Sequence, residues 1–164
     1  MYFRIAPELY LKRLIVGGMD KVFELNRNFR NEGLDRTHNP EFTVLEIYEA
    51  YGDMRSMQEL VQSLVVHLAG KIFNRTQVTW NGNEINLQTP WKEIAYCDLI
   101  KERLGAGWFE TSLDDARAKA AELGVAIEQG MNFAEVTHEI YDKTIEDTLI
   151  QPTFITRLPA YLVP

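Results

Sequence analysis

Two stretches of alternating residues, at about 21–31 and 42–51, constrain the fold of this chain most strongly. One side of the stretches is apolar and carries Phe23, Leu25, Phe29, Leu45 and Ile47. The other side is polar and carries Glu24, Asn26, Asn28, Arg30, Glu46 and Tyr48. Alternation with a period of two is typical of a β-strand that buries one face. The sequence therefore predicts two long antiparallel strands, joined by the polar segment 32–41.

Helical spacing surrounds this hairpin. Pro7 fits the first turn of a helix that ends at Gly17 and Gly18. Asp53 can cap a second helix over 54–72, whose apolar residues recur three and four positions apart. We expect the second helix to pack against the apolar side of the sheet, which gives an α+β fold.

Further elements follow in the second half of the chain. The segment 78–87 predicts a small hairpin with a left-handed turn at Asn81 and Gly82. Capping patterns predict helices over 112–124 and 132–147, both expected at the surface and the latter against the apolar side of the sheet. The run at 153–156 is a β-type stretch.

Composition favours a soluble globular protein with one domain. The chain has 164 residues, 46% of them hydrophobic, and no apolar run long enough to cross a bilayer, so we expect no membrane partner. The single Cys97 excludes an internal disulfide and cysteine-based zinc sites, and it fits the reducing cytoplasm, where we expect the protein. A net charge of -7 argues against a surface that binds nucleic acid as a whole.

The polar side of the predicted hairpin is a candidate site. Arg30, Glu46 and Tyr48 occupy positions where a sheet carries core side chains or plain solvating ones. One interpretation is a solvated sheet face. The other is a ligand-binding floor, in which Arg30 neutralises a phosphate or carboxylate, Glu46 receives a cation and Tyr48 orients that cation. A zwitterionic amino acid fits the second interpretation.

The segment between the strands strengthens the second interpretation, because loops between rigid strands often carry function. This loop region carries Glu32, Arg36, His38 and Phe42. His38 is either a hydrogen-bond donor to a phosphate or a loop histidine without a role. His67 and His138 lack a second ligand at metal-binding spacing, so no metal site is predicted.

Four segments resemble one known family. FRNEG at 29–33 and HNPEFTVLEIYEAY at 38–51 together resemble motif 2 of class II lysyl-tRNA synthetases. RIAPELYLKRLIVGG at 4–18 and LIQPTFIT at 149–156 resemble the same family, so the similarity runs essentially from end to end.

This resemblance implies a fold and a function. The fold is part of a class II aminoacyl-tRNA synthetase catalytic domain, an antiparallel sheet flanked by helices. It implies a single domain over 1–164, with the motif 2 hairpin at about 21–51 and a more variable region at about 74–147. The function is that of a lysine–tRNA ligase, a cytoplasmic homodimer that uses ATP and Mg²⁺ to join L-lysine to tRNA(Lys).

The resemblance also implies roles for residues at matching positions. Arg30 would bridge the α-phosphate of ATP and the carboxylate of lysine, as the catalytic residue. Glu32 would hold the adenine amino group, Phe42 would stack on the adenine ring, and His38 would approach the outer phosphates.

For lysine, the resemblance implies a second set of contacts. Glu8 and Glu46 would receive its amino groups, with Tyr48 at the side-chain end and Arg30 at the carboxylate.

The chain also departs from the family's pattern. Motif 1, motif 3 with its metal-binding acids, and the anticodon-binding domain are expected outside these residues, so we expect the chain alone not to aminoacylate tRNA. A sheet edge near 153–156 would favour self-association. Tyr161 stands where the family carries an acid.

Two other functions stay open at this stage. One is that of the synthetase paralogue that lysylates a translation factor. The other is a non-catalytic, synthetase-like assembly or regulatory module that has kept the fold and lost the reaction.

Overall fold

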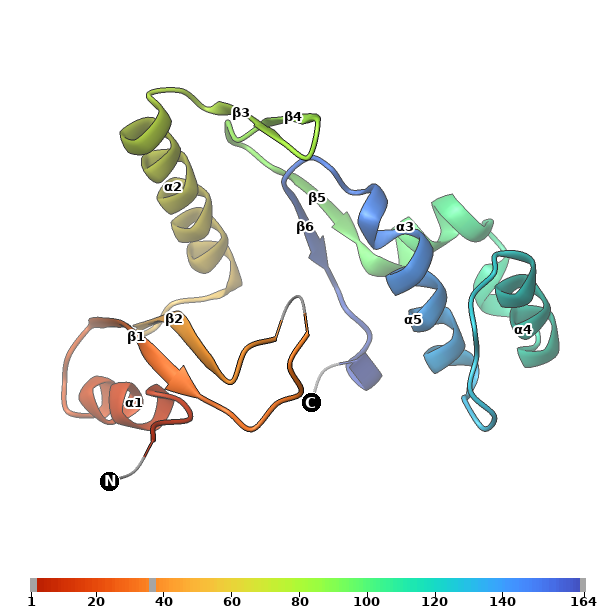
Figure 1. Cartoon of the computed structure of the whole chain (residues 1–164), viewed down its shortest axis with the longest axis horizontal. Helices are drawn as coiled ribbons and strands as arrows, with labels where there is room; N and C mark the ends of the chain where they lie inside the picture. The colour runs from red at the N-terminus through yellow and green to blue at the C-terminus, as the bar shows by residue number, and fades with distance from the viewer. Residues whose placement is uncertain (1–2, 36–37, 163–164) are drawn as a thin grey trace. The chain divides into compact units, whose positions relative to one another are not determined.

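Two compact units, residues 1–58 and 59–164, make up the chain. The computed structural model describes residues 3–35 and 38–162, so Arg36 lies outside the described residues. Each unit is described by itself below, with the element labels of Figure 1. The single domain expected over 1–164 stays a prediction.

The first unit contains a helix and a hairpin (Figure 1). Its elements are α1 (Glu8–Val16), β1 (Lys21–Phe29), β2 (Glu41–Glu49) and the start of α2 (Met54–Phe73). The strands β1 and β2 pair antiparallel over their whole length, as the alternation predicts. The helix α1 follows Pro7 and ends before Gly18, whose φ of 101° favours glycine.

The register of the hairpin divides its side chains between two faces, because directly opposed residues share a face. The pairs Glu24–Glu46 and Asn28–Phe42 lie on one face, which we call the polar face. The pairs Phe23–Ile47 and Leu25–Leu45 lie on the other, the apolar face. The division between polar and apolar residues is thus as predicted.

The helix α1 contacts the polar face of the hairpin, whereas a simple hydrophobic pattern predicts that the apolar face is the covered one. The helix α1 packs on both strands, and Lys12 of α1 lies over the ring of Tyr48 on the polar face. On that face Asn28 is fully buried, whereas Phe23 on the apolar face is 72% exposed. Helix packing against the apolar face, expected for 54–72 and 132–147, involves both units and stays a prediction.

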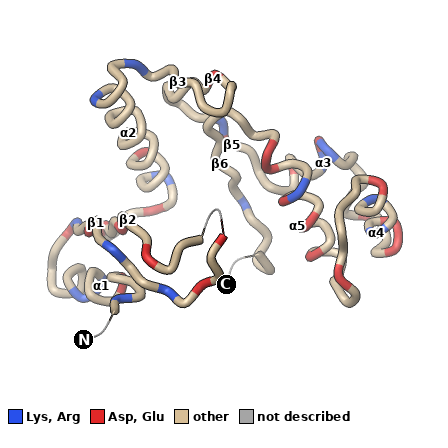
Figure 2. The backbone as a smooth tube through the Cα atoms, viewed as in Figure 1, with Lys and Arg blue, Asp and Glu red and all other residues tan. Residues whose placement is uncertain are grey.

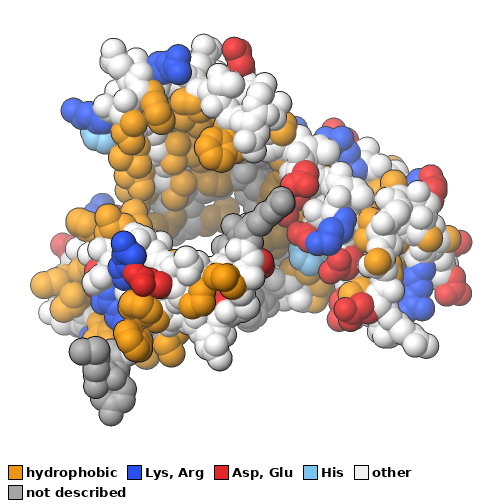
Figure 3. Space-filling view, viewed as in Figure 1, with side chains coloured by type: hydrophobic (Ala, Val, Ile, Leu, Met, Phe, Trp, Pro, Cys, Tyr) orange, Lys and Arg blue, Asp and Glu red, His pale blue; other side chains and the backbone are white. Residues whose placement is uncertain are grey.

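The helix α2 begins as the sequence predicts. The carboxylate of Asp53 accepts a hydrogen bond from the backbone N–H of Ser56 at 2.8 Å, and the hydroxyl of Ser56 accepts one from the N–H of Asp53 at 3.0 Å. Figure 3 shows hydrophobic side chains gathered over this helix, where Leu68 and Ile72 are 45% and 66% exposed. None of the described helices is long and apolar enough to span a membrane.

The second unit holds the remaining elements. They are β3 (Gln77–Trp80), β4 (Asn83–Asn86), β5 (Lys92–Ala95), α3 (Tyr96–Leu104), η1 (Trp108–Glu110), α4 (Leu113–Glu122), α5 (Phe133–Thr144), η2 (Glu146–Thr148), β6 (Thr153–Thr156) and η3 (Ala160–Leu162). The strands β3 and β4 form the predicted hairpin, with positive φ angles of 47° at Asn81 and 81° at Gly82. The strand β6 is also as predicted.

Two parts of the second unit differ from the expectations. The strand β5 and the helix α3 were not predicted, and β5 pairs with β6 in parallel, outside the antiparallel sheet. A four-residue strand that continues directly into a helix shows no period of its own. Its partner lies about sixty positions further along the chain, so only the folded chain reveals the pair.

The expectation of surface helices is confirmed for α4, which buries one face and exposes the other, whereas α5 is more buried than expected. The core of the second unit is built from α3, α4 and α5, and its fully buried side chains include Ala116, Ala120, Val136 and Ile140. The buried stripe of α4 consists of alanines, whose small side chains give little hydrophobic signal. The indole N–H of Trp108 donates to the hydroxyl of Thr137 at 3.0 Å inside this core.

The start of α5 is capped as predicted. The side chain of Asn132 accepts from the N–H of Glu135 at 3.1 Å, and the carboxylate of Glu135 accepts from the N–H of Asn132 at 2.7 Å. The helix ends at Thr144, earlier than the predicted position 147, and a 3-10 turn follows.

A pair of isoleucine substitutions tests this core. Ile140→Ala removes a fully buried side chain, so we expect the free energy of unfolding to fall by about 2 to 5 kcal/mol. Ile72→Ala is the matched control at a position that is 66% exposed, and we expect about 0.5 kcal/mol or less. Urea denaturation followed by circular dichroism measures both. Equal losses for the two variants would contradict the assigned core.

Candidate functional site

The polar face of the hairpin brings together most of the residues singled out in the sequence. Arg30, Phe42, Glu46 and Tyr48 come from the hairpin and the residue that follows β1, and Glu8 comes from α1. Figure 2 shows basic and acidic residues together along α1, β1 and β2. All five residues belong to the first unit.

Arg30 lies just beyond β1 and is held at both backbone and side chain. Its backbone N–H donates to the carbonyl of Pro40 at 2.9 Å, which continues the pairing of the two strands by one step. Its side-chain Nε donates to the carbonyl of Ile5 at 3.3 Å. The guanidinium carbon lies 5.1 Å from the centre of the Phe42 ring, a cation–π contact.

A hollow lies beside the hydrogen bond between Arg30 and Ile5. It has a volume of about 550 Å³ and is lined by Phe3, Arg4, Ile5, Ala6 and Tyr10. Ile5, whose carbonyl accepts the hydrogen bond from Arg30, therefore also lines this hollow. A ligand in this hollow would lie next to the backbone that anchors the guanidinium.

Glu46 and Tyr48 form the second part of the site. The hydroxyl of Tyr48 donates to a carboxylate oxygen of Glu46 at 2.7 Å. Burial, with the adjacent Glu46 carboxylate as a further cause, raises the pKa of Tyr48 to about 12. Tyr48 thus holds its proton at neutral pH and orients the carboxylate of Glu46.

The residues around this pair were not singled out by sequence reasoning. Glu24 lies directly opposite Glu46 in the register, so two carboxylates face each other across the strands. Arg4 forms an ion pair with Glu24. Hydrogen bonds from Asn26 and then Arg4 lower the pKa of Glu24, which keeps it ionised. The alternating pattern already places Glu24 on the polar side of its strand. The register then places it opposite Glu46.

Glu8 reaches this group from α1. It forms an ion pair with Lys12 one turn later, and the Lys12 ammonium lies 5.9 Å from the centre of the Tyr48 ring. An alkylammonium group therefore already sits between a carboxylate and an aromatic ring here. In the described part of the chain no basic side chain pairs with Glu46, although Glu8 and Glu24 each have a basic partner.

The two loop residues have different surroundings. The backbone N–H of Glu32 donates to the carbonyl of Arg30 at 3.0 Å, and Glu32 is exposed. The ring Nδ1 of His38 lies 2.9 Å from the carboxylate of Asp35, which also accepts from the His38 backbone. These contacts lie within the loop region, at Arg30 and Asp35, and not at Glu46.

The described residues contain no cluster of metal-ligating side chains. Within residues 3–35 and 38–162 no three side chains of the histidine, cysteine, aspartate or glutamate type gather to hold a metal ion. His138 stacks against Tyr141 with ring centres 6.0 Å apart.

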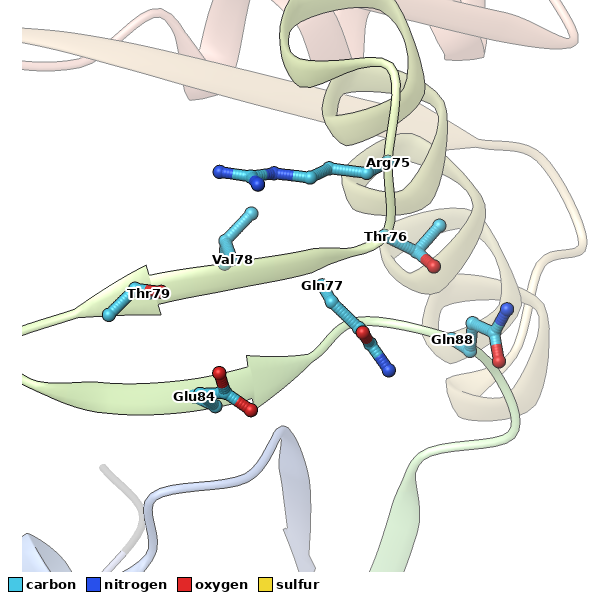
Figure 4. A pocket seen from close by; sticks show the side chains of 7 residues that line it. All are labelled: Arg75, Thr76, Gln77, Val78, Thr79, Glu84 and Gln88. Carbon is cyan, nitrogen blue, oxygen red and sulfur yellow. The ribbon is translucent and has the colours of Figure 1, made fainter.

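The second unit has hollows of its own. One, of about 420 Å³, follows the hairpin of β3 and β4 and is lined by Arg75, Thr76, Gln77, Val78, Thr79, Glu84 and Gln88 (Figure 4). Another, of about 520 Å³, includes His138 and Tyr161. Neither contains a residue that the sequence analysis assigned to ATP or lysine.

Comparisons with known proteins indicate one family. The whole chain, residues 1–164, matches the family described as class II tRNA synthetases for aspartate, lysine and asparagine (D, K and N). A lysine–tRNA ligase of Carboxydothermus hydrogenoformans is 46% identical over 167 residues, which cover all of this chain and 34% of that protein.

Two further relatives are also lysine–tRNA ligases. The lysine–tRNA ligase of Oceanobacillus iheyensis is 45% identical, and that of Staphylococcus aureus strain MW2 is 44% identical, each over 165 residues and all of this chain. The chain spans 34% and 33% of these two proteins, about a third of their length.

The environment of Tyr48 can be tested by titration. Because the folded state holds this proton more tightly than the unfolded state, whose pKa is near 10, the stability that Tyr48 contributes is present below pH 10 and is lost as pH rises towards 12. Glu46→Gln removes the adjacent charge, so we expect the pKa of Tyr48 to fall but to stay above 10, since burial remains.

Nuclear magnetic resonance of ¹³C-labelled tyrosine measures this pKa, and Tyr48→Phe assigns the signal. A Tyr48 that titrates near 10 in the unaltered chain, or one that does not respond to Glu46→Gln, would contradict the geometry of the pair.

Proposed function

Since the chain belongs to the class II tRNA synthetase family for aspartate, lysine and asparagine, we propose that its polar face is the amino-acid activation site of a lysine–tRNA ligase. The relatives that share this name support lysine among the three amino acids of the family. Its substrates are L-lysine, ATP and tRNA(Lys), and the protein acts in the cytoplasm as a homodimer.

The observation that carries the choice of lysine is the state of Glu46. Its carboxylate lies on the half-buried polar face, is oriented by the hydroxyl of Tyr48, and forms no ion pair with any described residue. A carboxylate in that state is stabilised by a positively charged donor, because an ammonium supplies both the opposite charge and hydrogen bonds. The nearby Lys12 ammonium beside Tyr48 supports a fit for an alkylammonium.

The opposite end of the site receives the reacting groups. Arg30 contacts the carboxylate of lysine and the α-phosphate of ATP together, which brings one oxygen of the carboxylate to the phosphorus. That oxygen forms a bond to phosphorus, the bond to pyrophosphate breaks, and lysyl-adenylate results. The positive charge of Arg30 stabilises the negative charge that develops on the phosphoryl oxygens.

The remaining contacts to ATP come from the hairpin and its loop. Phe42 stacks on adenine, Glu32 accepts from the adenine amino group, and His38 approaches the outer phosphates. A hydroxyl of the terminal tRNA ribose then attacks the carbonyl carbon of lysyl-adenylate and AMP leaves. This second step needs no covalent bond to the protein.

A single charge removal tests the lysine end. In Glu46→Gln a bound ammonium loses its charge partner, and we expect lysine affinity to fall by roughly 3 to 5 kcal/mol while ATP affinity changes little. Isothermal titration calorimetry with each ligand, on the protein that carries these residues, measures both constants.

The matched control is Glu41→Gln, which makes the same change on the opposite face of the hairpin, where Glu41 pairs with Arg27. We expect it to leave both affinities unchanged. The assignment fails if Glu46→Gln weakens lysine and ATP equally, or if arginine binds as tightly as lysine.

A further inference from the structure

Asn28 is a buried polar residue that the function above does not use. Its side chain is 0% exposed, and neither its amide oxygen nor its amide nitrogen has a hydrogen-bond partner among the described residues. Buried amides are normally hydrogen-bonded, because they lose their bonds to water on folding. An amide without partners therefore requires an explanation.

The position of Asn28 supplies one. It lies on the polar face, two residues before Arg30, and directly opposite Phe42 in the register. Directly opposed side chains in an antiparallel pair have Cβ atoms about 5 Å apart. Phe42 is also the ring over which the guanidinium of Arg30 lies, so Asn28 and the guanidinium are neighbours of the same ring.

The contacts of Arg30 in this structure conflict with its proposed role. Its guanidinium covers the Phe42 ring, which is the surface proposed for adenine. Its Nε donates to the carbonyl of Ile5 at 3.3 Å, which is longer than usual for such bonds. Adenine that stacks on this face of the ring displaces the guanidinium, and an arginine has five N–H donors to satisfy in its new position.

We propose that Asn28 is the positioning residue of Arg30. When adenine takes the place of the guanidinium on Phe42, the amide oxygen of Asn28 accepts a hydrogen bond from the guanidinium. That bond leaves the outer N–H groups directed at the α-phosphate and at the lysine carboxylate. The bond that Asn28 lacks in the free protein is thus made in the complex.

This inference rests on the proposed function, and it predicts that Asn28 acts only through Arg30. The probe is lysyl-sulfamoyl-adenosine, a stable mimic of lysyl-adenylate, and calorimetry gives its dissociation constant. Asn28→Leu keeps the size of the side chain and removes the acceptor, so we expect binding about tenfold weaker. Asn28→Asp keeps an acceptor oxygen, and we expect affinity within about threefold of the unaltered protein.

A double-mutant cycle separates positioning from a general structural role. In Arg30→Ala, the further change Asn28→Leu has nothing to position, and we expect an effect below about twofold. The temperature of unfolding of Asn28→Leu should equal or exceed that of the unaltered protein, since an apolar group replaces an unpaired amide. Thr43→Leu, on the opposite face beside Phe42, is the matched control and should bind the mimic normally.

The possible failures differ from one another. If the unaltered protein does not bind the mimic, the proposed function fails and the inference fails with it. If it binds the mimic but Asn28→Leu binds equally well, or the effects of Asn28→Leu and Arg30→Ala are additive, only the role of Asn28 is overturned. If Asn28→Leu unfolds, Asn28→Ala decides in its place, because it removes the acceptor without burying a charge, and binding of the mimic within twofold of the unaltered protein overturns the role.

Discussion

The register of β1 against β2 is the constraint on which the candidate site depends. With a side-chain period of two, a slip of one residue would move Glu46 and Tyr48 to the opposite face. The observed pairing instead places Glu24 opposite Glu46 and Asn28 opposite Phe42. The cross-strand contacts of the site follow from this register, including the cation–π contact between Arg30 and Phe42.

Charge explains how a polar face can be covered by a helix. Burial of a carboxylate is costly unless an opposite charge or a hydrogen bond compensates for it. Arg4 pairs with Glu24, and the ammonium of Lys12 in α1 lies over the ring of Tyr48. Glu46 receives only the hydroxyl of Tyr48 among the described contacts. The compensation is therefore incomplete at one carboxylate, and the proposed substrate supplies the missing charge.

The two units differ in what stabilises them. The second unit has a contiguous apolar core formed by α3, α4, α5 and their neighbours. In the first unit Leu11 and Pro7 are buried, but many large apolar side chains are exposed, among them Phe23 and Leu25. The hairpin therefore relies on backbone pairing, on the ion pair between Arg4 and Glu24, and on the contact of Lys12 in α1 with the ring of Tyr48. Binding of a ligand to the polar face would add stability there by mass action.

Local patterns by themselves determined a large part of this protein. The strands at 21–29 and 41–49, the helix α2 and the cap at Asn132 follow from periods and short-range hydrogen bonds, which need no knowledge of distant residues. Sequence resemblance likewise indicated the family. The chemistry of Glu46 and Tyr48 was accessible for the same reason, since both lie on one strand.

Only the tertiary structure decided the rest, because it depends on residues far apart in the chain. The parallel pairing of β5 with β6 joins segments about sixty positions apart, and the alanine stripe of α4 became core only through its neighbours. The covering of the polar face by α1, the guanidinium over Phe42 and the unpaired amide of Asn28 likewise require the folded chain. An alternating pattern assigns residues to faces, but it does not determine which face the next helix covers.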